Sequence, residues 1–144
     1  MDVSAMSQKY NVFDHTADLG IEIYGRDEKE LFSNAVFALF DIMTDIHVVY
    51  TTMERDIFVE GADREDLMVN FLREILYLFN GEGFSVHDFL VFEVDSHQIR
   101  GTARGEFFDP DRHCLHKEIK AVTYHRTEVK RVSDGWRARV IFDV

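Results

Sequence analysis

The chain has 144 residues, of which 46% are hydrophobic and 30% charged, and this balance fits one globular domain and excludes a disordered chain. The single cysteine, Cys114, excludes an internal disulfide and any zinc or iron–sulfur site built from several cysteines. The net charge of −11 argues against a general nucleic-acid binder, which would usually be basic.

Residues 10–25 predict two strands joined by a polar turn. The turn covers residues 14–18, and the second strand covers Gly20–Tyr24. In that second strand Ile21 and Ile23 alternate with Glu and Tyr, which is the period of a half-buried strand.

Two helices follow, separated by a strand. Asp27 is the expected N-cap of the first, with Glu30 completing a capping box. Its apolar residues cover so much of its circumference that we expect it at the centre of the core. Residues 54–60 predict a strand, and Asp63 and Gly81 mark the start and end of the second helix.

The remaining chain predicts four strands, at residues 86–95, 98–108, 118–132 and 136–144. The last two are joined at residues 133–135, where Asp-Gly is a strong hairpin signal. The order is therefore ββαβαββββ. It predicts an α+β fold with two helices packed on a largely antiparallel sheet.

Three polar clusters are candidates for a functional site. The first is the turn from Asp14 to Asp18, where two carboxylates, the His15 imidazole and a hydroxyl crowd together. Oxygen ligands of this kind suit hard cations such as Ca²⁺ or Mg²⁺. The alternative is that Asp and Thr only cap the turn, with His15 as an ordinary turn histidine.

The second cluster is the segment 117–125, predicted to be extended. Alternation would place its residues on two faces, Glu118, Lys120, Val122 and Tyr124 on one and Ile119, Ala121, Thr123 and His125 on the other. A lysine beside a metal-bound phosphate would supply a point charge. The alternative is a solvated edge with ordinary charge pairs.

The third cluster is the last strand, where Ala138, Val140 and Phe142 alternate as a core face. Asp143 points the other way and, with the carboxyl group of Val144, makes an anionic tip. Such a tip is either frayed or held by a cation.

The sequence contains no pattern typical of a catalytic site. It lacks a Gly-rich phosphate loop, a G-x-S-x-G motif and a Cys/His nucleophile arrangement. The His-Cys-Leu-His run at residues 113–116 matches no usual zinc spacing. The start of the chain shows no signal peptide and no apolar run is long enough to cross a bilayer, so we expect a cytoplasmic protein that does not contact membranes.

Three motifs in order, FDHTADLGIEIYG, KEIKAVTYH and a terminal FDV, resemble the archease family. The resemblance runs from Tyr10 to Val144, which leaves residues 1–9 as an expected flexible tail before a single domain at 10–144. It implies a non-catalytic accessory protein of tRNA splicing that activates the GTP-dependent RNA ligase, promoting its guanylylation and multiple turnover. It also implies, as an alternative, a chaperone-like modulator of a tRNA cytosine-5 methyltransferase.

The resemblance also implies a divalent-cation site, with Ca²⁺ as the expected ion and Mg²⁺ or Mn²⁺ as alternatives. Transferred residue by residue, it assigns metal ligands to Asp18, Asp143 and Val144. The resemblance also assigns contacts with the partner or its nucleotide to Lys120, Glu118 and His15. The ligase is then the expected partner, without stable direct binding of nucleic acid. A third hypothesis, from the residues alone, is an independent metal-dependent hydrolase.

Overall fold

The computed structural model describes residues 8–15 and 18–144, and its elements follow the predicted order ββαβαββββ with one short 3₁₀ helix added. The elements are β1 (Tyr10–His15), β2 (Asp18–Gly25), α2 (Glu28–Met43), η1 (Ile46–Val48), β3 (Met53–Glu60), α3 (Arg64–Asn80), β4 (Phe84–Val94), β5 (Gln98–Phe107), β6 (Ala121–Val132) and β7 (Gly135–Asp143). The predicted tail at residues 1–9 stays a prediction, because residues 1–7 lie outside the described residues.

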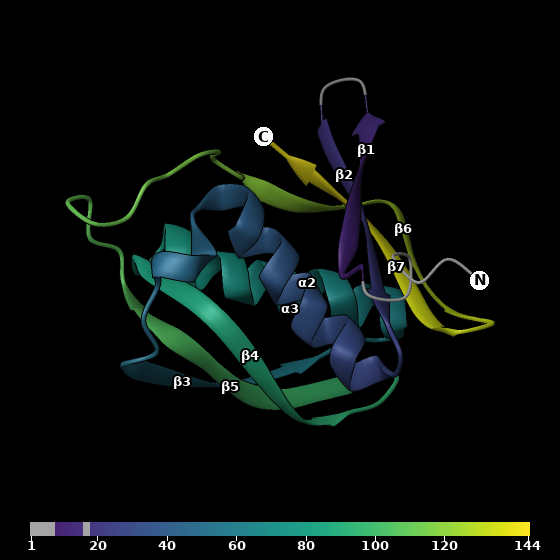
Figure 1. The fold of residues 1–144 in the computed structure, drawn as a ribbon. Helices are drawn as coiled ribbons and strands as arrows, with labels where there is room; N and C mark the ends of the chain where they lie inside the picture. Colours follow the sequence, from purple (N-terminus) through teal and green to yellow (C-terminus); the bar gives the residue numbers. More distant parts are fainter. Residues whose placement is uncertain (1–7, 16–17) are drawn as a thin grey trace.

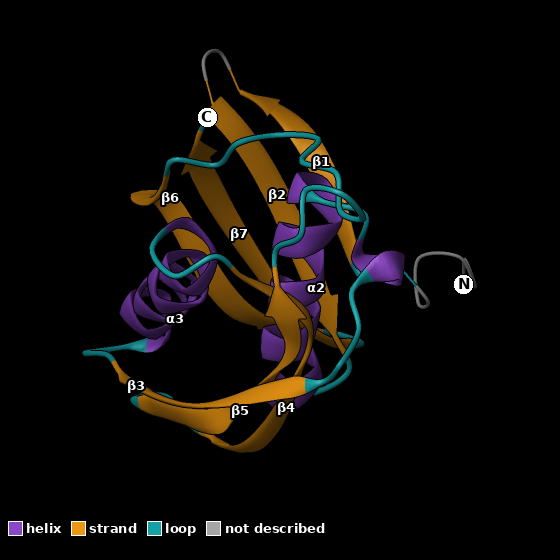
Figure 2. Cartoon of the chain, turned by 90° about the vertical axis from the view of Figure 1, so that its left-hand side faces the viewer, coloured by secondary structure: helices purple, strands orange, loops and turns teal. Residues whose placement is uncertain are grey.

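The strands form two antiparallel sheets rather than one. β1-β2-β7-β6 make a four-stranded sheet, and β3-β5-β4 make a three-stranded sheet. Both helices lie between them, so each sheet covers one side of the helical layer (Figures 1 and 2). Packing between two sheets is expected for α2, because its apolar residues occupy more than one side of the helix and must be buried there. Among the described residues, no helix is long and apolar enough to span a bilayer.

Aromatic side chains connect the helical layer to the three-stranded sheet. The rings of Phe32 on α2 and Phe71 on α3 pack edge to face with centroids 5.4 Å apart. Phe71 packs in the same way on Phe89 of β4, at 5.0 Å. All three side chains are buried, so one row of rings joins two helices and a sheet.

The helix starts are capped as the sequence predicted. The side chain of Asp27 accepts the N–H of Glu30 at 2.8 Å, and that of Asp63 accepts the N–H of Asp66 at 2.8 Å. The capping box of α2 is modified, because the Glu30 carboxylate accepts the N–H of Arg26 instead of that of the cap residue. These caps fix where both helices begin.

The predicted hairpin between β6 and β7 is also confirmed. Val132 pairs with Gly135, which leaves Ser133 and Asp134 as the turn. Gly135 has φ +146°, and a Cβ there would lie 2.2 Å from the carbonyl oxygen of Gly25. Glycine is therefore required at this position, both for the backbone conformation and for the close approach of the β2–α2 connection.

Candidate functional site

The register of the four-stranded sheet brings two of the three predicted metal ligands together. Asp18, at the start of β2, pairs directly with Asp143, at the end of β7. Directly opposed residues share one face of a sheet, with Cβ atoms about 4.5–5.5 Å apart. Asp143 is exposed and Asp18 is half-buried, so the pair opens to solvent at the end of the sheet where the chain terminates (Figure 1).

A third strand borders the same position. On the other side of β7, Ala121 of β6 pairs with Asp143, and the N–H of Lys120 donates to the carbonyl of Asp143 at 2.8 Å. Lys120 and Glu118 are both exposed. The structure thus places Asp18, Asp143 and the backbone of Lys120 side by side. The side chain of His15 lies outside the described residues.

The predicted strand from Glu118 was wrong in its first residues, because β6 begins at Ala121. Ile119 turns inward and is fully buried, and its carbonyl accepts the side-chain N–H of Asn80 at 2.9 Å. Val122 is buried as well, so two residues three apart face the core and the predicted alternation fails. The anchored backbone at Ile119 is what positions Lys120.

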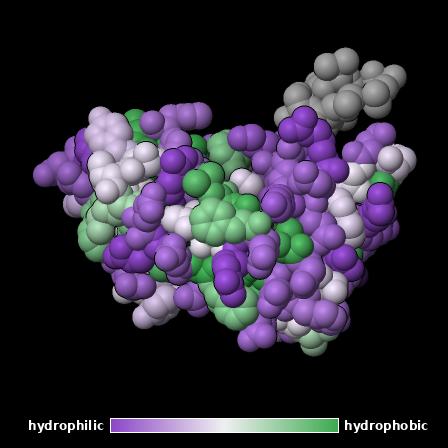
Figure 3. Space-filling model, turned by 90° about the horizontal axis from the view of Figure 1, so that it is seen from below, coloured by the Kyte–Doolittle hydropathy of each residue, from purple (hydrophilic) through white to green (hydrophobic). Residues whose placement is uncertain are grey.

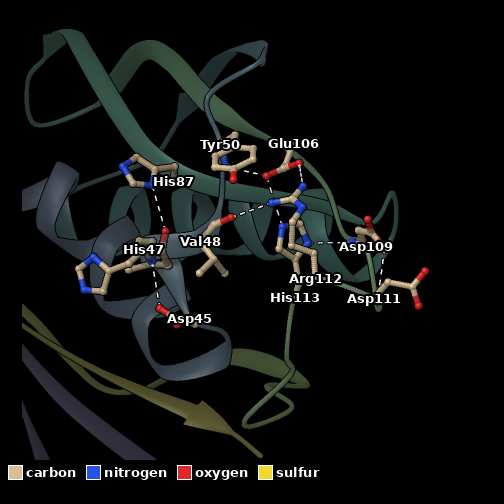
Figure 4. A network of polar contacts seen from close by, with 11 residues as sticks. Asp45, His47, Val48, Tyr50, His87, Glu106, Asp109, Asp111, Arg112 and His113 are labelled. Carbon is tan, nitrogen blue, oxygen red and sulfur yellow. Dashed lines mark hydrogen bonds and ion pairs between the residues drawn. The ribbon is translucent and has the colours of Figure 1, made fainter.

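The connection from β5 to β6 reaches this end of the sheet and is tied down at its beginning (Figure 4). The carboxylate of Glu106 accepts hydrogen bonds from the guanidinium of Arg112 and from the N–H of Tyr50, the latter at 2.6 Å. The hydrogen bond from Arg112, with further donors, lowers the pKa of Glu106 to about 2. Arg112 also donates to the carbonyl of Val48 at 2.9 Å and lies over the Tyr50 ring.

The buried side chain of His113 also anchors the connection from β5 to β6. Its Nδ1 accepts the N–H of Asp109 at 2.8 Å, so its Nε2 carries the proton and faces the Glu106 carboxylate at 3.3 Å. Both ring nitrogens are engaged, and neighbouring Cys114 is exposed.

The middle of the connection pairs with the end of α2. Thr44 and Leu115 form an isolated bridge, and the N–H of His116 donates to the carbonyl of Met43 at 2.7 Å. Sequence reasoning missed this series of anchors. The anchoring residues lie in a stretch whose sequence predicts a loop and nothing more. The groups that they contact lie in other elements. The one available signal was a polar segment too long for a tight turn.

Among the residues that the structure describes, the candidate side-chain ligands are fewer than a complete metal site requires. Within the described residues, no group of three or more His, Cys, Asp or Glu side chains is placed to hold a metal ion. Asp18 and Asp143 supply two carboxylates. Thr16 and Ala17, and the side chains of Asp14 and His15, belong to the predicted acidic turn but lie outside the described residues. Any metal ligand other than the carboxylates of Asp18 and Asp143 therefore stays a prediction.

Comparison with known proteins identifies the family. Residues 10–144 match the model of the Archease protein family (MTH1598/TM1083). The chain belongs to the archease family. A protein described as "Protein archease" from Pyrococcus furiosus is 39% identical over 141 residues, covering 95% of this chain and 99% of the relative. Another from Methanosarcina barkeri is 34% identical over 146 residues, covering 99% and 100%.

Solved archease structures show the same fold. The solution structure of protein 1598 from Methanobacterium thermoautotrophicum has a TM-score of 0.80 and 34% identity, covering 94% of this chain and 99% of that one. A crystal structure from Thermotoga maritima, described as an archease and possible chaperone, has a TM-score of 0.64 and 23% identity over 92% of this chain and 94% of that one. This archease chain thus shares the family's architecture with both.

Proposed function

We propose that this protein is a non-catalytic accessory factor of the archease type that activates a GTP-dependent tRNA-splicing RNA ligase through a divalent-cation site at Asp18 and Asp143. The observation that supports the proposal is the register of β2 and β7, which sets these two carboxylates opposite each other. Two like charges in directly opposed positions destabilise a sheet, and a bound cation would remove that cost.

The donor chemistry of this end fits a hard cation. Carboxylate oxygens are the ligands that Ca²⁺, Mg²⁺ and Mn²⁺ prefer, and a main-chain oxygen of Val144 would be a third donor beside Asp143. When bound, such an ion would neutralise phosphate charge. Phosphoryl transfer gains mainly from placement and electrostatic stabilisation, so a partner without catalytic machinery can still accelerate it.

Lys120 is the proposed contact to a phosphate of the ligase-bound nucleotide. It is exposed, its backbone is hydrogen-bonded to Asp143, and its ammonium group acts as a point charge toward phosphate. Glu118 and His15 stay proposed contacts at the same end. A chain with net charge −11 also suits docking to a ligase whose RNA-binding surface is basic. Modulation of a tRNA methyltransferase stays a prediction.

Cation binding can be tested on the protein alone. We expect Ca²⁺ titration by calorimetry to detect one site, and Asp18→Asn and Asp143→Asn each to weaken it about tenfold or more, since each removes a charged ligand. Asp134→Asn is the matched control. Asp134 is an exposed carboxylate in the β6–β7 turn, at the opposite end of the same sheet. Equal Ca²⁺ affinity in all four proteins would reject the site.

Ligase activation needs a second assay. We expect the protein to stimulate guanylylation and multiple-turnover ligation by the RNA ligase, and expect Asp18→Asn and Asp143→Asn to lose that stimulation while Asp134→Asn retains it. Stimulation that persists in both site variants would reject the role of the carboxylate pair. Absence of any stimulation by the wild-type protein would reject activation of the ligase itself.

A further inference from the structure

The outer face of the three-stranded sheet exposes a group of large apolar side chains. Phe58 of β3 is 49% exposed, and Leu90 and Phe92 of β4 are 43% and 54% exposed. In Figure 3 apolar atoms gather in the middle of this face and hydrophilic residues surround them. Solvated sheet faces are usually polar, and contiguous apolar patches mark interaction sites.

This apolar patch has a defined shape. A hollow of about 410 Å³ lies on it, lined by Asp56, Ile57, Phe58, Phe92, Arg100 and Gly101. Phe92 sits in a β-bulge between Val91 and Glu93, a feature that redirects side chains. The guanidinium of Arg100, directly opposite Phe58, lies 5.2 Å from the centre of that ring. Side chains from three strands therefore build one surface.

The charges around the patch are mostly negative. Besides Glu106, which is bonded to Arg112, the register places five carboxylates on the same outer face, those of Glu54, Asp56, Glu60, Asp88 and Glu93. The same face carries two guanidinium groups, of which Arg104 is paired with Asp88 and Arg100 lies over Phe58. The patch is thus apolar in the middle and anionic around it. Phosphate groups and a second copy of the same face would both be repelled.

We propose that this face binds a segment of another protein that presents apolar side chains flanked by lysine or arginine. Apolar side chains fill the hollow beside Phe58 and Phe92, and the cationic ones meet the surrounding carboxylates. The face lies at the end of the molecule away from the C-terminus (Figure 1). It therefore acts independently of the site proposed at Asp18 and Asp143.

The test uses the full chain and a short labelled peptide of alternating leucine and lysine, titrated by fluorescence anisotropy. We expect the double variant Phe58→Ser/Phe92→Ser to weaken binding about tenfold or more, because both rings line the hollow. Tyr77→Ser is the control, since Tyr77 is 57% exposed on α3, outside this face. Both rings are half exposed, so circular dichroism melts are expected to match the wild type.

A charge reversal tests whether the carboxylates around the patch contribute to peptide binding. Glu60→Lys is expected to weaken the leucine–lysine peptide about threefold at low salt and to strengthen a leucine–glutamate peptide, with both differences shrinking as salt is added. Glu74→Lys is the matched control. Glu74 is an exposed carboxylate on α3 and its reversal leaves this face unchanged.

Four results would overturn the proposal. The first is equal affinity of the wild type and the Phe58→Ser/Phe92→Ser variant, and the second is equal binding of the two peptides by the wild type. The third is a wild-type dimer in sedimentation that the double variant abolishes, which would assign the patch to a second copy of the chain. The fourth is displacement of the peptide by single-stranded RNA, which would assign the patch to nucleic acid.

Discussion

The outer face of the four-stranded sheet is held by ion pairs, whereas the outer face of the three-stranded sheet exposes apolar side chains. On the first, the guanidinium of Arg137 lies 2.9 Å from Glu128, and that of Arg139 lies 3.5 Å from Glu22. On the second, Phe58 and Phe92 are about half exposed. The inner faces of both sheets pack on the same helices, so the fold itself does not explain the contrast. The contrast lies in the outward residues alone.

The strongest test of this contrast compares Phe71 of α3, which packs on the inner face of β4, with Phe92 on the outer face of β4. Phe71→Ala is expected to lower the free energy of unfolding by about 3–5 kcal/mol, because it empties the buried row of rings between the helices and β4. Phe92→Ala, on the opposite face of the same sheet, is expected to change it by less than about 0.5 kcal/mol. Urea unfolding measures both, and similar losses would contradict the assignment of Phe92 to a solvent-facing patch.

A second prediction concerns the connection from β5 to β6, which leads into the four-stranded sheet and is anchored through Glu106. Glu106→Gln is expected to cost about 1.5 kcal/mol at neutral pH, because it weakens the charge-assisted hydrogen bond with Arg112. The pKa of Glu106 is lowered from 4.5 to about 2, so this stabilisation is complete above pH 4.5 and is lost as the pH falls toward 2.

Urea midpoints at pH 6 and pH 3 measure the pH dependence of Glu106. The wild type is expected to lose more stability between the two than Glu106→Gln does. The exposed carboxylate of Glu74 serves as a control, and Glu74→Gln is expected to follow the wild type. A parallel pH dependence in wild type and Glu106→Gln would contradict the role of this carboxylate.

The smallest expected effect is at the edge of the four-stranded sheet. The hydroxyl of Tyr10 on β1 donates to Asp41 of α2 at 2.7 Å, and burial together with this hydrogen bond raises the pKa of the phenol. Tyr10→Phe is expected to cost about 1 kcal/mol in urea unfolding. Tyr77→Phe, at an exposed position, is expected to cost less than about 0.5 kcal/mol. If both variants unfold alike, the Tyr10 hydrogen bond contributes nothing to holding β1.

Local signals in the sequence predicted the local structure well. The caps at Asp27 and Asp63 and the Asp-Gly hairpin depend on a few neighbouring residues, and each is confirmed. The division into two sheets was not predictable, because alternation shows that a segment is a strand and does not identify its partner. The same limit explains the error at Ile119, whose side chain is buried in the core and whose carbonyl accepts a hydrogen bond from Asn80 of α3, 39 residues earlier in the chain.

The candidate site was predictable only in part. Asp18 lies in a predicted acidic turn and Asp143 in a predicted acidic tip, and the resemblance to the archease family assigned both as metal ligands. The register places them opposite each other. The contacts of Glu106 with Arg112 and His113 were not predicted, because a polar loop gives no periodic signal. The apolar patch depends on the bulge at Phe92, which alternation alone does not reveal.

The position of β7 between β2 and β6 constrains how this protein can change over evolution. Strand residues alternate between two faces, so deleting one residue between Gly135 and Asp143 would turn every later side chain to the other face. Asp143 would then point toward the helices, away from Asp18, and Phe142 would leave the core. The number of residues in this strand is therefore fixed more tightly than their identity, whereas surface loops tolerate additional residues far more readily.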